Sequence, residues 1–132
     1  MVKFSEKEVK FLEGQEVCRL ATSSKSLQPH VVPVCYIFHK GHFYIATDFD
    51  TKKLKNLKEN RKVSLVVDVY RQPKNKAIFI QGEAEILERG EEFKEISEIF
   101  FKKFYWARAD PWEEGETVIL KIKPEKKISW GI

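Results

Sequence analysis

Short runs of β-branched and aromatic residues recur along the sequence, and tight turns separate most neighbouring runs. Apolar side chains at every second position from Val63 to Val69 predict a strand with one firmly buried face. Turn residues at 40–41 and 72–75 lead the chain directly into the next run. Because hairpin turns join strands that run in opposite directions, the sequence predicts an antiparallel sheet.

We expect seven short strands and three helices. The strands are expected at 16–22, 30–38, 42–47, 63–69, 78–86, 117–122 and 127–130. The helices are expected at 5–14, 51–60 and 91–105, the first opening with Ser5 and Glu8 as a capping box. This order favours a mainly β fold with a few helices, a six- to seven-stranded antiparallel split β-barrel rather than a layered sandwich.

Length and composition bound the organisation of the chain. The 132 residues, 42% of them hydrophobic, predict one folded domain covering 1–132 and exclude a disordered chain. No apolar run reaches the length of a membrane span, and charged residues interrupt every candidate leader near the N-terminus. We therefore expect a cytoplasmic protein without a membrane partner.

Two features of the residue usage bear on the surroundings of the protein. The chain has 19 Lys and 16 Glu, a bias typical of the surface of a thermophile protein. Its two cysteines, Cys18 and Cys35, form neither a CxxC pair nor a zinc quartet, so two buried free thiols are expected.

The strongest candidate site runs from Thr47 to Leu54. A predicted strand ends at Thr47 and a helix begins near Thr51, so the free N–H groups of its first turn lie beside Lys52 and Lys53. Cations at a helix N-terminus cost about 0.3 to 1 kcal/mol each, and a bound anion would offset that cost. The segment therefore predicts a phosphate site. A solvated lysine face in a lysine-rich protein is the alternative.

Other residues give weaker signals. The histidines His30, His39 and His42 lack metal-ligand spacing, so no metal is expected. Glu83 and Glu85 are expected to face solvent, and neither a catalytic triad nor a glycine-rich phosphate loop is present. The aromatic residues that follow the longest helix could stack on a planar ligand, but core packing is the expected role of Trp106 and Trp112.

Several segments together resemble a known family. They are Arg19–Thr22, Gln28–Val34, Phe43–Thr47, Thr51–Asn60, Val63–Asp68 and Ile128–Gly131. In these segments the chain resembles the FMN-binding split-barrel family related to pyridoxamine 5'-phosphate oxidase. The resemblance implies an FMN-binding type of split barrel and a homodimer, with a flavin at the subunit interface.

The resemblance also implies which residues hold the flavin. Residues of the second strand would run beside the ring system through their backbone, namely Val32, Pro33, Val34, Cys35 and Tyr36. Ala46 and Thr47 match a contact pair at the end of a strand, and Thr51, Lys52 and Lys53 match the phosphate clamp. Trp130 matches the C-terminal tryptophan of the family. The clamp is the same segment that helix electrostatics selected.

Three departures from the oxidase pattern affect the expected substrate. Val32 stands where the oxidase has Arg, Lys76 and Ala77 stand where it has Gln, and the Arg-x-His motif that follows its tryptophan does not occur. We therefore expect no true pyridoxamine phosphate oxidase. The expected function is an FMN-dependent oxidoreductase acting on an unidentified small redox substrate.

Three alternatives stay open at this point. The same groove suits a deazaflavin coenzyme, which would make the protein a deazaflavin-dependent reductase. A non-catalytic flavin-binding or storage protein needs no catalytic side chain. Nucleic-acid binding through the six cations between Thr51 and Lys62 is disfavoured, because the sheet lacks an aromatic and basic RNA-binding signature, so no nucleic acid is expected as a partner.

Overall fold

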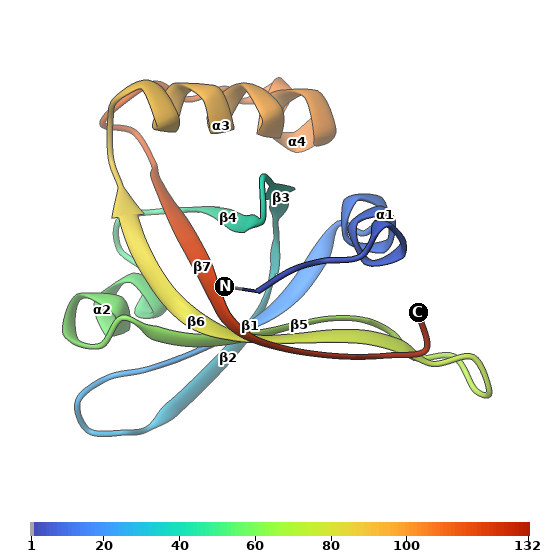
Figure 1. Ribbon diagram of the computed structural model, residues 1–132. Coiled ribbons are helices and arrows are strands. Elements are labelled where there is room, and N and C mark those ends of the chain that lie inside the picture. The colour runs from blue at the N-terminus through green and yellow to red at the C-terminus, as the bar shows by residue number, and fades with distance from the viewer. Residues whose placement is uncertain (1) are drawn as a thin grey trace.

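The computed structural model describes residues 2–132 and contains seven antiparallel strands and four helices within them. The strands are β1 (Val17–Ser23), β2 (Pro29–Cys35), β3 (Ile37–His39), β4 (His42–Thr47), β5 (Lys62–Val69), β6 (Lys76–Leu87) and β7 (Val118–Trp130). The helices are α1 (Glu6–Gly14), α2 (Lys52–Glu59), α3 (Glu91–Lys103) and α4 (Tyr105–Ala109). Figure 1 shows the strands as one strongly curled sheet, with α3 and α4 lying apart from its curved part. The mainly β split barrel expected from the sequence is confirmed.

The order of strands in the sheet explains its curl. The order is β2-β1-β5-β6-β7-β4-β3, so the two edge strands, β2 and β3, are neighbours in the sequence. Only Tyr36 separates them, and its backbone N–H donates to the Glu16 carbonyl at 3.1 Å. The single strand predicted at 30–38 is therefore wrong, because the chain changes pairing partner from β1 to β4 at Tyr36.

The two strands predicted at 117–122 and 127–130 are one strand, β7. Its pairing with β6 shifts between Gln81 and Gly82, since Gln81 lies opposite Lys126 and Gly82 opposite Pro124. The skipped residue Glu125 marks a β-bulge, which bends a strand without ending it. The total of seven strands agrees with the prediction because one predicted strand divides and two others join.

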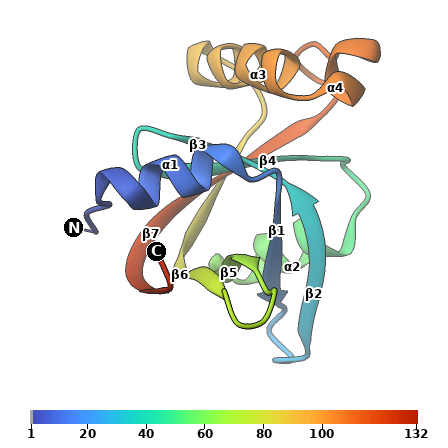
Figure 2. The same ribbon diagram turned by 90° about the vertical axis from the view of Figure 1, so that its right-hand side faces the viewer.

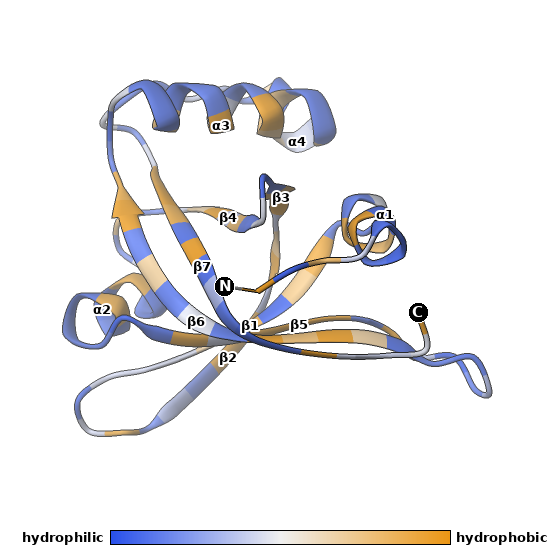
Figure 3. Ribbon diagram, in the orientation of Figure 1, coloured by the Kyte–Doolittle hydropathy of each residue, from blue (hydrophilic) through white to orange (hydrophobic). Residues whose placement is uncertain are grey.

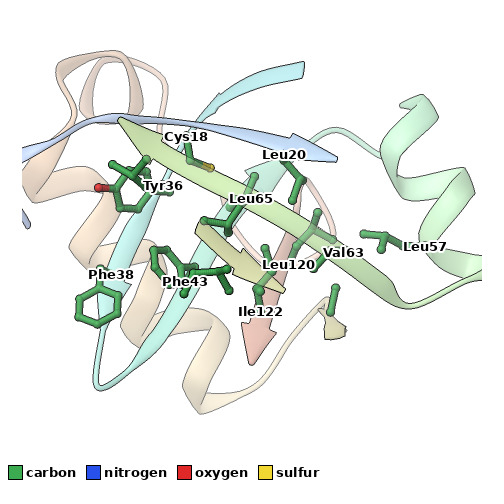
Figure 4. Close-up of a cluster of buried hydrophobic side chains, with 14 of the residues drawn as sticks. Cys18, Leu20, Tyr36, Phe38, Phe43, Leu57, Val63, Leu65, Leu120 and Ile122 are labelled. Atoms are coloured by element: carbon green, nitrogen blue, oxygen red, sulfur yellow. The ribbon is translucent and has the colours of Figure 1, made fainter. Parts of the chain in front are cut away.

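The interior of the curl holds the main hydrophobic core. In Figure 4, labelled side chains of β1, β4, β5 and β7 point toward one another from facing parts of the sheet. The cluster also includes Leu12 of α1 and Leu54 and Leu57 of α2, all almost fully buried. Alternating hydrophobic and hydrophilic bands along β6 and β7 mark their inner and outer faces (Figure 3). Helices α1 and α2 are thus fixed to the barrel by their apolar side chains.

A second hydrophobic cluster lies under α3 and α4. Phe93, Ile96 and Phe100 of α3 pack against Ile37, Tyr44 and Ile119, which belong to the strands on this side of the sheet. The helix predicted at 91–105 ends at Lys103, and α4 begins after Phe104. Both views show this helical layer covering the end of the barrel that holds β3 and β4 (Figures 1 and 2).

Polar contacts fix α1 to β7. The predicted capping box is confirmed, because the Ser5 hydroxyl accepts from the Glu8 N–H and the Glu8 carboxylate accepts from the Ser5 N–H. The same carboxylate accepts from Lys127 Nζ at 2.6 Å and from Ser129 Oγ at 2.7 Å. The N-terminal helix is therefore tied to the far end of the chain.

Candidate functional site

The first turn of α2 leaves its N–H groups without a side-chain cap. Thr51 is the N-cap residue, but its hydroxyl donates to the Asp48 carbonyl at 3.2 Å instead of accepting from the helix. The hydroxyls of Thr47 and Thr51 are hydrogen bonded to each other at 3.2 Å. Two hydroxyls and the positive end of the helix therefore lie together, an arrangement suited to an anion.

Lys53 is the unusual charge of this turn. Its side chain is half-buried, and none of the six ion pairs found in residues 2–132 includes it. Burial lowers the pKa of Lys53, and the nearby Asp48 opposes that shift in part. Lys52, in contrast, is exposed. The chain therefore holds one partly desolvated cation at the end of a helix where cations are already unfavourable.

A pocket opens beside this turn. Its volume is about 300 Å³, and Thr47, Thr51 and Lys53 form one part of its wall. Trp106 and Trp112, which follow α3 in the sequence, form another part. The structure thus brings Thr51 and Lys53 of the predicted clamp together with two indole rings, whereas Lys52 does not line the pocket. Two carboxylates, Asp48 and Asp110, line it as well. This pocket is the candidate functional site.

The strand β4 and the body of α2 hold the clamp in place. The Thr117 hydroxyl donates to the Thr47 carbonyl at 2.9 Å, which fixes the end of β4 against the start of β7. The Asn56 side-chain amide donates to the Thr22 hydroxyl at 3.0 Å, and both residues are buried. The helix that carries Lys53 is therefore anchored on its inner side by packing and by a buried hydrogen bond.

Residues 32–36 lie on both faces of β2. Val32 pairs with Leu20 and Val34 with Cys18, so these two valines point toward the interior. Pro33 and Cys35 point to the outer face. The Tyr36 ring is fully buried, and its hydroxyl donates to the Leu12 carbonyl. Tyr36 is 0% exposed in the single chain, and its backbone N–H donates to the Glu16 carbonyl.

Cys35 and Ala46 lie near the pocket. Both pack at the margin of the cluster under α3, and Ala46 also lines the pocket. Burial raises the pKa of the Cys35 thiol, while the neighbouring Trp106 side chain opposes the increase. Cys18 is buried and Cys35 only half-buried, and both are free thiols. The two thiols lie on opposite faces of the β1–β2 pair.

Trp130 does not lie with the clamp in one chain. It stands at the C-terminal end of β7, opposite Ala77, whereas the N-terminal end of β7 pairs with Thr47. The C-terminus and α2 are on different sides of the molecule in both ribbon views (Figures 1 and 2). A site containing both Trp130 and Lys53 therefore requires a second chain.

The sequence predicts core packing for Trp106 and Trp112, with stacking on a planar ligand as the alternative. The expectation of core packing is correct for Trp112, which is half-buried and donates to the Ser97 hydroxyl at 2.8 Å. Trp106 is 46% exposed, so core packing is wrong as its sole role. The break at Phe104 between α3 and α4 changes the direction of the helix and turns this indole to the pocket. The helical periodicity of α3 therefore does not predict which way the residues of α4 face.

The remaining candidates form no second centre of chemistry. His39 is bonded to Glu95 at 3.0 Å, and His42 is bonded to the Lys40 carbonyl at 3.1 Å. Glu83 and Glu85 are exposed, as expected. In the part of the chain described, no group of three or more potential ligands could hold a metal ion. The helices of residues 2–132 include none long and apolar enough to span a membrane.

The curled antiparallel sheet, with a pocket beside the N-terminus of α2, defines a split-barrel protein. The model of the family described as pyridoxamine 5'-phosphate oxidase matches residues 4–131, so the chain belongs to this family. The family resemblance expected from the sequence is confirmed. No protein of curated function matches the chain significantly in sequence.

Solved structures show the same fold. An FAD-binding protein from Mesorhizobium loti is 28% identical, with a TM-score of 0.75 over 96% of this chain and 91% of that chain. A conserved hypothetical protein from Mycobacterium tuberculosis is 20% identical, with a TM-score of 0.81 over 98% and 86%. A heme storage protein from Vibrio cholerae is 17% identical, with a TM-score of 0.81 over 93% and 92%. The two less similar neighbours support the fold alone.

Proposed function

We propose that the chain is a homodimeric flavoprotein that binds FMN noncovalently and transfers electrons or hydride to a small molecule. The observation that carries this proposal is Lys53, a half-buried cation that belongs to none of the ion pairs of residues 2–132 and lines a pocket beside the hydroxyls of Thr47 and Thr51. The carboxylates of Asp48 and Asp110 line the same pocket, and Asp48 offsets only part of the effect of burial on Lys53. A phosphate group would supply the ion-pair partner that Lys53 does not have among these residues. Membership of the pyridoxamine 5'-phosphate oxidase family supports the same ligand.

Each residue has a defined role in this proposal. Lys52 and Lys53 bind the phosphate, while Thr47 and Thr51 orient it through their hydroxyls. The backbone of residues 32–36 and Ala46 border the ring system. Bound flavin supplies the redox chemistry, and the protein supplies binding, orientation and exclusion of water. The proposal assigns no catalytic side chain.

Titration with FMN tests the clamp. The double variant Lys52→Ala/Lys53→Ala should bind FMN about 10- to 100-fold more weakly, because hydrogen bonds to charged groups contribute about 1.5 to 3 kcal/mol. The matched control replaces Lys55→Ala and Lys58→Ala, which removes the same charge from exposed positions of the same helix. Equal dissociation constants for the two double variants would reject the clamp.

Two observations support a homodimer. Trp130 and Lys53 lie near opposite ends of the 13-residue strand β7, so one site can include both only if two chains contribute. The outer face of the sheet also carries exposed apolar side chains, including Val31, Ile128 and Trp130. The strand register places all three on the face opposite the core. A second copy of the chain is the partner that satisfies both observations.

The visible spectrum of protein purified from its own source separates the competing ligands. The deazaflavin coenzyme carries a phosphate and a tricyclic ring that suit the same pocket, but it absorbs differently from FMN. A Soret band would instead indicate heme, which the Vibrio cholerae neighbour stores. His39 and His42 are hydrogen bonded within the chain, whereas the buried Nδ1 of His30 has no hydrogen-bond partner in residues 2–132, so the spectrum decides between flavin and heme.

Oxidoreductase activity and simple flavin storage are separated by kinetics. The reduced holoprotein is mixed rapidly with oxygen, quinones and free flavins, and reoxidation is followed by absorbance. An enzyme should react much faster with one class of acceptor than with the others. A storage protein should show no specific acceptor, and that result would reject the redox part of the proposal.

A further inference from the structure

Trp106 is an exposed indole whose position is nonetheless fixed. Its ring stacks on Phe104 with centroids 5.5 Å apart and an interplanar angle of 30°. Trp112 lies 6.1 Å away and Phe100 lies 6.4 Å away, between ring centroids. These contacts hold one side of the indole, while 46% of the residue remains exposed. A large apolar ring held rigidly at the surface is suited to contact another flat ring.

The same indole borders two groups of proposed flavin contacts. It lines the pocket that contains Thr47 and Lys53, and it lies near enough to Cys35, at the end of β2, to lower the pKa of that thiol against the effect of burial. It therefore lies between the phosphate clamp on α2 and the strand assigned to the ring system. The other exposed aromatic residue of α4, Tyr105, is 74% exposed and does not line this pocket.

We propose that Trp106 is the ring-binding wall of the pocket: its open face contacts the planar ring of the ligand whose phosphate is bound by Lys53. This inference rests on the proposed function and adds a residue that determines specificity for flat aromatic ligands. Lys53 recognises the anionic end of the ligand and Trp106 its ring. The two contributions are separable, because one is electrostatic and the other depends on stacking.

Binding of two ligands to three variants separates these contributions. The ligands are FMN and riboflavin, which share the ring but differ in the phosphate. Trp106→Leu should weaken binding of both by a similar factor of about 3 to 10, the range expected for one aromatic contact. Lys53→Ala should weaken FMN binding and leave riboflavin binding nearly unchanged. Tyr105→Leu, the control on the same helix, should change neither.

Flavin fluorescence gives a readout that a merely structural role of Trp106 would not change. An indole in contact with the ring quenches flavin emission by electron transfer, so FMN at saturation should be strongly quenched on the wild type and on Tyr105→Leu. Bound FMN should be several-fold brighter on Trp106→Leu. Trp106→Phe keeps an aromatic ring in the cluster, but phenylalanine quenches flavin emission less than tryptophan does. FMN should therefore bind to Trp106→Phe with an affinity closer to that of the wild type than Trp106→Leu shows, while the bound FMN stays brighter than on the wild type.

The outcomes distinguish this inference from the function on which it rests. If the wild type binds neither FMN nor riboflavin, the proposed function fails, and the inference fails with it. If the wild type binds FMN and Lys53→Ala weakens it, the clamp stands. Equal affinity and equal brightness of bound FMN on folded Trp106→Leu and wild type would then overturn the inference alone. If Trp106→Leu does not fold, the brightness of bound FMN on Trp106→Phe decides: emission equal to that on the wild type would overturn the inference.

Discussion

Glu8 and Lys53 are both charges in the first turn of a helix, and their surroundings differ in kind. The Glu8 carboxylate is buried but accepts hydrogen bonds from Lys127, Ser129 and the Ser5 N–H. Lys53 is half-buried and forms no ion pair with the part of the chain that the structure describes. The charge on Glu8 therefore stabilises the fold, whereas burial of the charge on Lys53 costs free energy that the nearby Asp48 offsets only in part.

Stability in acid should depend on Glu8. Burial alone would raise the pKa of Glu8, but hydrogen bonds from Lys127, Ser129 and Ser5 lower it from 4.5 to about 2. A depressed pKa means that ionised Glu8 stabilises the fold above about pH 4.5, and that this contribution is lost as the pH falls toward 2. Glu8→Gln should lower the free energy of unfolding by about 1 to 3 kcal/mol at pH 7 and by much less near pH 2.

Urea unfolding between pH 7 and pH 2 measures this difference. The control is Glu6→Gln, which removes the same charge from an exposed position in the same first turn. Its free energy of unfolding should stay within about 0.5 kcal/mol of the wild type at pH 7. A constant gap between Glu8→Gln and the wild type across the whole pH range would contradict the assignment.

Without ligand, Lys53 should lower stability. Lys53→Met keeps the length of the side chain and removes the desolvated charge, so the free energy of unfolding should rise by about 0.3 to 1 kcal/mol in a buffer without phosphate. Lys58→Met is the matched control, because Lys58 lies in the last turn of α2 and interacts favourably with the helix dipole. The free energy of unfolding of Lys58→Met should equal that of the wild type or be lower. Thermal unfolding of both variants, with and without FMN, tests the contrast, and lower stability of Lys53→Met without FMN would argue against it.

At the scale of elements, the sequence predicts strands well and pairing partners poorly. The run at 30–38 has a continuous apolar pattern, yet Tyr36 divides it between the two edges of the sheet. Pro124 reads as an end of a strand, yet it lies beside a bulge within β7. Hydrophobic periodicity indicates which residues of a strand are buried, but it does not indicate which other strand pairs with it. The start of α2 near Thr51 follows from local sequence, although the Thr51 hydroxyl does not cap the helix. The position of Trp106 depends on the break at Phe104, which local sequence does not indicate.

The bulge opposite Gly82 allows an unusually close approach of β6 and β7. A Cβ atom at Gly82 would lie 2.1 Å from the Lys123 carbonyl oxygen, so Gly82→Ala requires a backbone shift. We expect this variant to lose about 2 to 4 kcal/mol of stability. Gly14→Ala is the matched control, because a Cβ at Gly14 meets nothing within 4 Å. Guanidinium unfolding should show a large shift for the first variant and at most a small gain for the second. Equal midpoints would show that the bulge tolerates a side chain.

At the scale of the whole molecule, the proposed site is distributed over the length of β7. Its N-terminal end pairs with Thr47 next to the clamp, and its C-terminal end carries Trp130. The outer face of the sheet joins these ends and exposes apolar residues that a single chain leaves in water. The family and the position of Lys53 follow from local sequence. The completion of the site does not, because in the proposed homodimer Trp130 and Lys53 of one site come from different chains.

Disrupting the outer face should therefore weaken flavin binding from a distance. Ile128 is 60% exposed on this face and lies far along β7 from the clamp, so Ile128→Lys leaves Lys53 and the pocket untouched. Burying a lysine against a second copy is unfavourable, and we expect a monomer by sedimentation and FMN binding weaker by about tenfold or more. Tyr105→Lys adds the same charge at an exposed position of α4, and it should leave both measurements unchanged. A monomeric Ile128→Lys variant that binds FMN as tightly as the wild type would show that one chain holds the complete site, and Trp130 would then have no role in it.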